Sequence, residues 1–323
     1  MDSDFKLFRC KRAEWISWLH GDDEHSIKNQ ILDMSENYLL YRAINETRRL
    51  AIQRKENAAV LNPLIAQFID NAFYTMQTLA IRRLTDKFEK KPKYQVTSIR
   101  CLLDDVFKHR HLFTRKIYVS FDGTPFDPEP TRLNYDQHTT LEWQEYRKIH
   151  GPGSVRWVSQ VPESGPEAWQ RSCDRHSTFD RLSGKTTRSG IDTVCEKVFT
   201  TLYNCINNNV IINTQRICNK RIAHAASKSS RLAVQHTEKM NFAEIDVAHR
   251  SLIIVSQFIS KILLDSQPIN PAPIDCFDRF EQLEYPWLSS VDKSEIDGIW
   301  CNLILEREHW AWSEAEDDIL AQL

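Results

Sequence analysis

A short basic segment, CNKRIAHAASKSSR at residues 218–231, combines side chains that can handle a phosphate group. Lys220, Arg221 and His224 fall within five positions, and Arg231 ends the segment. An imidazole moves protons near neutral pH, and neighbouring cations can hold a phosphate while it does so. The other interpretation is a solvated helix end, where Lys, Arg and His face the negative end of the helix dipole. The segment alone is compatible with both.

The spacing around His224 places several polar side chains together if the helix is continuous. Lys220 and Arg221 precede His224 by four and three residues, so the three side chains share one side of an α-helix. Arg216 would lie at the edge of that side, and Asn219 would lie nearly opposite. In the alternative interpretation His224 packs into the core and the cations are solvated.

Two further clusters outside this segment could carry chemistry. His176 and Asp180 are four residues apart. This spacing suits an imidazole oriented by a carboxylate or a pair of metal ligands. An ordinary exposed pair on one helix is the favoured interpretation. Arg82 and Arg83 precede Asp86 by four and three residues at the end of a predicted helix. An intrahelical ion pair is the default there, and a charge facing a cleft is the alternative.

Composition limits the classes of function. The 323 residues include 42 Lys and Arg against 44 Asp and Glu, so a net charge of -2 gives no global attraction to nucleic acid, and RNA binding needs a local patch. The eight cysteines include no C-x-x-C pair, and the eight glycines form no phosphate-binding loop, so we expect neither a metal nor a cofactor. No apolar run approaches the roughly 20 residues that cross a bilayer. The first residues lack a signal peptide's apolar segment, so we expect a cytoplasmic protein without a membrane partner.

Apolar residues that recur at steps of three and four predict helices over most of the chain. The helical segments are residues 25–53, 61–88, 98–116, a segment from 191 into the basic motif, 241–265 and 292–312. Asn62 with Pro63, and Ser98, are start signals, and the asparagine triplet at 207–209 could begin a new helix. His249 lies on the apolar face of 241–265, which predicts a hydrogen-bonded core histidine. These patterns predict an all-α protein, an antiparallel helical bundle.

Clusters of proline and glycine predict where the bundle is interrupted. Residues 118–170 hold several such clusters, which predicts a loop-rich insertion with any short strands confined to about 115–165. The sequence therefore suggests a helical domain over 22–271 that contains this insertion, followed by a C-terminal helical appendage over 272–323.

Four segments, MQTLAIRRLTDKF, LLDDVF, HSTFDRLSG and NKRIAHAASKSSR, together resemble the AbiU2-like branch of the HEPN superfamily. These are helical proteins of prokaryotic defence and toxin systems, and the resemblance spans residues from about 25 to 265. It implies a helical core that usually forms a homodimer. It also implies metal-independent RNA cleavage, because active members carry an R-x(4–6)-H motif. The motif histidine assists attack by the RNA 2′-hydroxyl, and the motif arginine binds the phosphate.

The resemblance assigns roles to particular residues of the basic segment. His224 matches the motif histidine, and Asn219 matches a polar residue often found within the motif. The motif arginine is expected at position 218, where this chain has Cys218, so Arg221 or Arg216 would bind the phosphate instead.

The resemblance also implies a function and partners. Lys220 and Arg231 would add contacts to RNA, and the chain would act as an endoribonuclease in phage defence or in a toxin–antitoxin system. An antitoxin or another defence-system protein would then be a partner besides the second copy in a homodimer. The alternative is a catalytically inactive helical module for dimerisation and interaction. A metal-dependent hydrolase around His176 and Asp180 has the least support.

Overall fold

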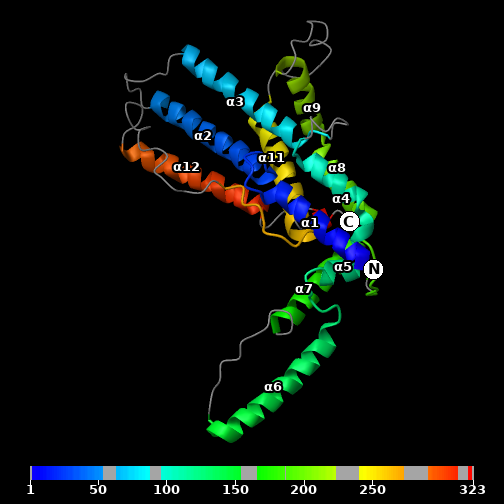
Figure 1. Ribbon diagram of the computed structural model, residues 1–323. Helices are drawn as coiled ribbons and strands as arrows, with labels where there is room; N and C mark the ends of the chain where they lie inside the picture. Colours follow the sequence, from blue (N-terminus) through cyan, green and yellow to red (C-terminus); the bar gives the residue numbers. More distant parts are fainter. Residues whose placement is uncertain are drawn as a thin grey trace. The chain divides into compact units, whose positions relative to one another are not determined.

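A computed structural model describes residues 2–53, 63–87, 96–153, 166–185, 187–222, 240–272, 290–311 and 319–321 (Figure 1). Within these ranges the chain is helical and forms no strand, and one isolated bridge pairs Thr114 with Thr193. The predicted all-α class is confirmed. The short strands expected near 115–165 are absent from the described part of that range.

The chain divides into two compact units, one from Met1–Ala13, Val106–Phe199 and Leu323, and the other from Glu14–Asp105 and Thr200–Gln322. These boundaries differ from the predicted domains 22–271 and 272–323. Whether 272–323 folds apart from the rest stays a prediction, because a compact unit is no test of independent folding.

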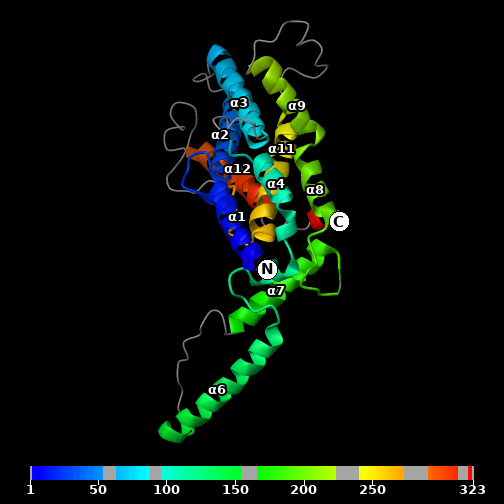
Figure 2. The same ribbon diagram turned by 45° about the vertical axis from the view of Figure 1, so that its right-hand side comes forward.

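The larger unit is a bundle of helices. Its complete helices are α2 (Ile27–Gln53), α3 (Pro63–Leu84), α9 (Asn209–Ile217), α11 (Phe242–Gln257) and α12 (Ser290–His309), with π-helical turns η3 (Cys218–Ile222) and η4 (Phe258–Leu263). Parts of α1 (Asp2–His20), α4 (Ile99–Lys108) and α8 (Glu196–Ile206) belong to it as well. α2 packs between α3 and α12, and α3 packs against α9 and η3 (Figures 1 and 2).

Polar side chains set where these helices begin. The hydroxyl of Ser98 accepts the backbone N–H of Cys101 at 3.0 Å, so the predicted cap of α4 is confirmed. Asn208 caps α9 by accepting the N–H of Ile211 at 3.0 Å, so the asparagine triplet does begin a new helix. α3 begins at Pro63 as predicted, whereas Asn62 lies outside the described residues.

The smaller unit contains η2 (Arg110–Leu112), α5 (Arg115–Ser120), α6 (Pro128–His150) and α7 (Pro166–Ser183), and both α5 and α6 pack against α7 (Figure 1). The prediction of a loop-rich segment over 118–170 is wrong for α6. Asp127 caps this helix, Pro128 starts it, and Gly151 ends it with φ 93°. Proline and glycine thus mark the two ends of a helix here, where both residue types are favourable.

Candidate functional site

The basic segment lies against the C-terminal end of α3. Nε of Arg82 on α3 donates to Oδ1 of Asn219 on η3 at 3.4 Å. One helical turn earlier, Nε2 of Gln215 on α9 donates to the Thr85 hydroxyl at 2.9 Å. These two contacts hold the asparagine of the predicted motif beside the arginine pair of α3.

The predicted motif begins on a π-helical turn, although a continuous α-helix was expected. η3 contains Asn219, Lys220 and Arg221, and its i→i+5 pairing changes the angle between successive side chains. The face that Lys220 and Arg221 would share with His224 on an α-helix stays a prediction, because it depends on where His224 lies. Turns of this π-helical kind are frequent at functional sites. His224 and Arg231 lie outside the described residues.

Arg216 and Cys218 differ in exposure at the junction of α9 and η3. Arg216 is exposed, and its Nη1 donates to Oδ1 of Asn213 at 3.4 Å. Cys218 is buried at 1 % exposure. Burial raises the pKa of the Cys218 thiol, and the positive charge of Arg82 offsets only part of this effect. Position 218 therefore holds a neutral thiol, and the nearby fixed charge belongs to Arg82.

The end of α3 is fixed by contacts on two sides. Arg82 forms the predicted ion pair with Asp86 four residues later, although α3 itself ends at Leu84. The carbonyl of Asp86 accepts the Ser98 hydroxyl at 2.6 Å and the Cys101 thiol at 3.3 Å, which ties this end to the start of α4. Arg83 is exposed and faces a cavity, as the alternative interpretation had it.

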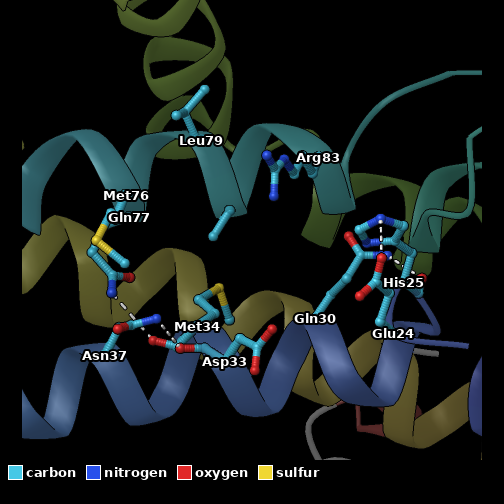
Figure 3. A pocket seen from close by; sticks show the side chains of 11 residues that line it. Glu24, His25, Gln30, Asp33, Met34, Asn37, Met76, Gln77, Leu79 and Arg83 are labelled. Atoms are coloured by element: carbon cyan, nitrogen blue, oxygen red, sulfur yellow. Dashed lines mark hydrogen bonds and ion pairs between the residues drawn. The ribbon is translucent and has the colours of Figure 1, made fainter.

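Two adjoining cavities lie between the start of α2 and the second half of α3. The first has a volume of about 400 Å³ and is lined by Glu24, His25, Gln30, Asp33, Met34, Asn37, Met76, Gln77, Leu79, Ala80 and Arg83 (Figure 3). The second, of about 450 Å³, is lined by Asp23, His25, Gln30, Arg83, Asp86, Val96 and Thr97. Because they share three residues and the second includes Asp86, the cavities extend to the carboxylate that pairs with Arg82.

Hydrogen bonds from two glutamines support the walls of the first cavity. Nε2 of Gln30 donates to the carbonyls of His25 and Thr97 at 2.7 and 2.8 Å. Gln77, at 1 % exposure, donates to the Met34 carbonyl at 3.2 Å, and its Oε1 lies 2.8 Å from Nε2 of His249. The amide of Gln77 therefore connects the cavity wall to the core.

His249 is a core histidine, as predicted. It is fully buried, and burial followed by the charge of Arg307 holds its pKa well below the ordinary value of 6.5. Arg307 on α12 is also fully buried, pairs with Asp246 at 3.2 Å and stacks over the Tyr38 ring at 4.5 Å. A fully buried, neutral imidazole that contacts Gln77 has a structural role in the core.

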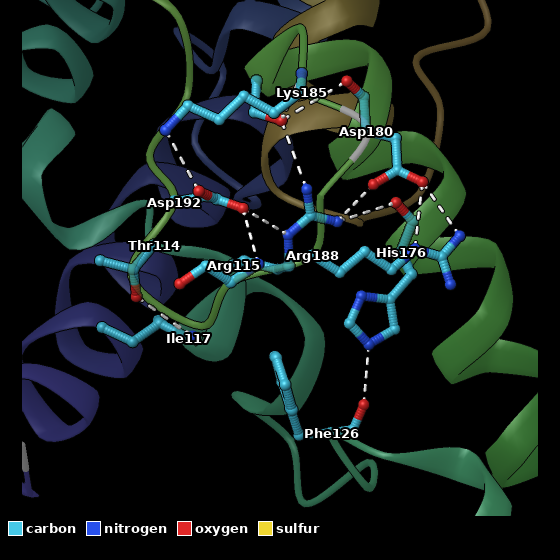
Figure 4. Close-up of polar contacts among 11 residues, drawn as sticks. Thr114, Arg115, Ile117, Phe126, His176, Asp180, Lys185, Arg188 and Asp192 are labelled. Carbon is cyan, nitrogen blue, oxygen red and sulfur yellow. Dashed lines mark hydrogen bonds and ion pairs between the residues drawn. The ribbon is translucent and has the colours of Figure 1, made fainter.

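The pair His176 and Asp180 belongs to a buried network in the smaller unit (Figure 4). Arg115, at 0 % exposure, donates from Nη1 to Asp180 at 2.5 Å and from Nε to Asp192 at 3.2 Å. Burial would raise the pKa of Asp180, but hydrogen bonds from Arg188 and Arg115 lower it below its usual value.

The imidazole of His176 takes a different partner. Its Nε2 lies 2.7 Å from the carbonyl oxygen of Phe126, and burial lowers its pKa although this contact raises it in part. The preferred prediction of an exposed helix pair with Asp180 is therefore wrong. Among the residues that the structure describes, no three His, Cys, Asp or Glu side chains come together as a metal site would require.

Comparison with known proteins adds no assignment: no family model, curated protein or solved structure matches this chain. Over the described ranges, no helix combines the length and the apolar character that a membrane span requires. The function has to be inferred from the chemistry of the site itself.

Sequence reasoning missed several residues of this site. The cavity residues His25, Asp33 and Gln77 belong to no recognisable sequence motif. The contact between Arg82 and Asn219 joins two distant segments, so no local sequence pattern predicts it. The spacing of Arg82 and Arg83 ahead of Asp86 was the signal that pointed to this end of α3.

Proposed function

We propose that this chain binds RNA where η3 meets the end of α3, and that it cleaves the bound strand without a metal. The observation that carries the proposal is the contact between Arg82 and Asn219. It brings the cations of the basic segment and those of α3 to one place on a chain whose net charge is only -2. A local cationic patch is what RNA binding requires of such a chain.

Arg82 supplies the fixed charge that position 218 lacks. Its Nε contacts Asn219, which directly follows Cys218, so the guanidinium lies close to the position where the resemblance predicts an arginine. A guanidinium has five N–H donors, of which Arg82 uses Nε for Asn219 and Nη1 for Asp86. Its planar arrangement of donors suits phosphate oxygens, whereas a neutral thiol offers no charge to them.

The proposed reaction is an internal transfer of the RNA phosphate. A base takes the proton of the 2′-hydroxyl, the 2′-oxygen bonds to the adjacent phosphorus, and the bond to the 5′-oxygen breaks. An acid returns a proton to that 5′-oxygen, which leaves a 2′,3′-cyclic phosphate and a 5′-hydroxyl. His224 is the proposed acid and base, and Arg82 stabilises the negative charge that develops on the phosphorus oxygens.

The setting proposed for this reaction follows the resemblance. We place the chain in the cytoplasm, in a phage-defence or toxin–antitoxin system, as a homodimer with an antitoxin or another defence-system protein as partner. Lys220, Arg221, Arg216 and Arg231 would extend the contact with RNA beyond Arg82.

A second candidate function is a catalytically inactive interaction module. Large apolar side chains on α3 favour it, because Phe68 is 72 % exposed and Ile65 is 51 % exposed. Exposed apolar groups at such spacing are typical of a surface that a partner covers. Sedimentation at micromolar concentration tests the homodimer that this function needs.

RNA binding at several salt concentrations tests the proposed function. The measurement is fluorescence anisotropy with a labelled single-stranded RNA in EDTA. Arg82→Gln should weaken binding and reduce the slope of log affinity against log salt by about 0.7, the value for one lost phosphate contact on a single strand. The matched control is Arg49→Gln, a paired arginine on α2. Unchanged binding in Arg82→Gln would contradict the proposed site, and absence of binding in the wild type would favour the interaction module.

A further inference from the structure

The first cavity has a chemistry of its own, distinct from the cationic surface beside it. It presents the carboxylates of Glu24 and Asp33 and the guanidinium of Arg83, and its apolar lining includes Met34 and Met76. A volume of about 400 Å³ lies within the range of small-molecule sites. Figure 3 shows Arg83 on α3 across the cavity from the α2 segment that carries Asp33.

Two of these charges are available to a ligand. Among the residues that the structure describes, the guanidinium of Arg83 and the carboxylate of Asp33 make no hydrogen bond or ion pair. Asn37 donates its amide to the backbone carbonyl of Asp33 at 2.7 Å and so leaves the carboxylate unoccupied. The cavity therefore offers acceptors on one wall and one cationic donor group on the other.

The placement of acceptors on one wall and a cation on the other favours one of the four RNA bases. Guanine carries two adjacent N–H donors, at N1 and at the exocyclic N2, and one carboxylate can accept both. Adenine, cytosine and uracil each place an acceptor nitrogen or oxygen next to a donor on the corresponding edge, which a carboxylate repels. Unpaired bases are read in this way, by hydrogen bonds to their Watson–Crick edge and by packing against apolar side chains.

We infer that this cavity binds a guanine nucleotide of the RNA strand, with Asp33 accepting the N1 and N2 protons. Arg83 contacts the phosphate of that nucleotide, and Met76, which is 46 % exposed, packs against the base. Arg83 directly follows Arg82 on α3, so one strand can contact both cations, with guanosine next to the cleaved bond. The assignment to an RNA strand, rather than to a free nucleotide, rests on the proposed function. The neighbouring cationic surface would bind the rest of that strand.

Titration with the four nucleoside monophosphates tests this inference directly. Isothermal titration calorimetry should give GMP an affinity at least about tenfold above AMP, CMP and UMP, the discrimination that one bidentate base contact provides. Asp33→Asn should lose this preference, because an amide replaces one acceptor by a donor. Arg83→Gln should weaken GMP binding and leave the binding of guanosine unchanged. Asp297→Asn, an exposed change on α12, is the matched control and should keep wild-type binding.

The outcomes separate this inference from the proposed function. Equal binding of all four nucleotides, or no binding of GMP by the folded wild-type protein, would overturn the inference even if the protein cleaves RNA. Selective GMP binding that Asp33→Asn abolishes would support the cavity assignment even if no RNA is cleaved. For a protein that does cleave RNA, mapping the cut positions should place them next to guanosine, and cuts without base preference would overturn it.

Discussion

Arg82 and Asn219 lie 137 residues apart in the chain, and the guanidinium of one donates to the amide oxygen of the other. Arg82 belongs to the last turn of a core helix, and Asn219 belongs to a π-helical turn that carries two cations. Each segment alone is compatible with a solvated helix end. Their contact concentrates positive charge at one place, and the proposed RNA site depends on that concentration.

Removing the carboxylate that pairs with Arg82 should strengthen RNA binding. Asp86→Asn takes away a negative charge from the surface and releases Nη1 of Arg82 for a phosphate oxygen. The partly exposed i,i+4 pair contributes about 0.3–0.5 kcal/mol to folding, so the variant should remain folded. Anisotropy at low salt should show tighter binding of single-stranded RNA than in the wild type. Weaker binding in this variant would mean that Asp86 orients Arg82 rather than competing with RNA for it.

Placing arginine at position 218 should destabilise the protein. Cys218 is 1 % exposed and lies within reach of the charge of Arg82, so Cys218→Arg would bury a second cation beside the first. An uncompensated buried charge costs about 3–5 kcal/mol. Urea denaturation should detect this loss, and Cys218→Ala should lose much less. A Cys218→Arg variant as stable as the wild type would show that the site has room and counter-charge for two arginines.

The smaller unit should depend on Arg115. Arg115→Ala leaves the carboxylates of Asp180 and Asp192 without their shared partner, so the free energy of unfolding should fall by about 3–5 kcal/mol. Arg188→Ala removes only the exposed partner of Asp180 and should cost less than about 1 kcal/mol. Chemical denaturation monitored by circular dichroism compares the two variants. Equal losses of stability in the two variants would mean that the buried Arg115 contributes no more to folding than the exposed Arg188.

Stability should decrease as the pH falls below the ordinary histidine pKa. The pKa of His249 is held well below 6.5 in the folded chain, so under mildly acidic conditions the unfolded chain binds a proton that the folded chain does not. The free energy of unfolding should therefore drop below about pH 6.5, by up to about 1.4 kcal/mol per pH unit for this residue. Above about pH 6.5 the titration of His249 should no longer change the free energy of unfolding.

Denaturation of His249→Gln at pH 5.5 and at pH 7.5 isolates this contribution. The glutamine amide can still donate to Gln77, and it does not titrate. The variant should lose less stability between the two pH values than the wild type does. An equal loss in both proteins would assign the pH dependence to other groups, such as His20, whose pKa burial also lowers.

Several helices of the larger unit could be predicted because their signals are local, whereas α1 was not among the predicted segments. Ser98 and Pro63 mark helix starts, and apolar steps of three and four identify α2, α3 and α11. α6 was missed because proline and glycine at its two ends were interpreted as loop signals, and because it has no buried side chain to produce an apolar stripe. A helix of this kind shows little periodicity in its sequence.

The candidate site could be predicted only in part. The cations of residues 219–221 are visible in the sequence because they are neighbours, but the contact with Arg82 depends on how α3 and η3 pack. The cavity combines α2 and α3, and none of its polar residues forms a recognisable spacing across these elements. The burial of His176 is likewise determined by the packing of Phe126, fifty residues away.

Cleavage of a single-stranded RNA in EDTA is the most direct test of the central claim. Wild-type protein should cut the strand in the presence of the chelator and leave 2′,3′-cyclic phosphate ends. His224→Ala should abolish cleavage while RNA binding stays nearly intact, because the imidazole transfers protons and holds no phosphate. The account would be contradicted by cleavage that EDTA abolishes, or by a folded wild-type protein that binds RNA at high concentration and leaves it uncut. A His224→Ala variant with a lowered Tm and unchanged cleavage would contradict the proposed role of this histidine.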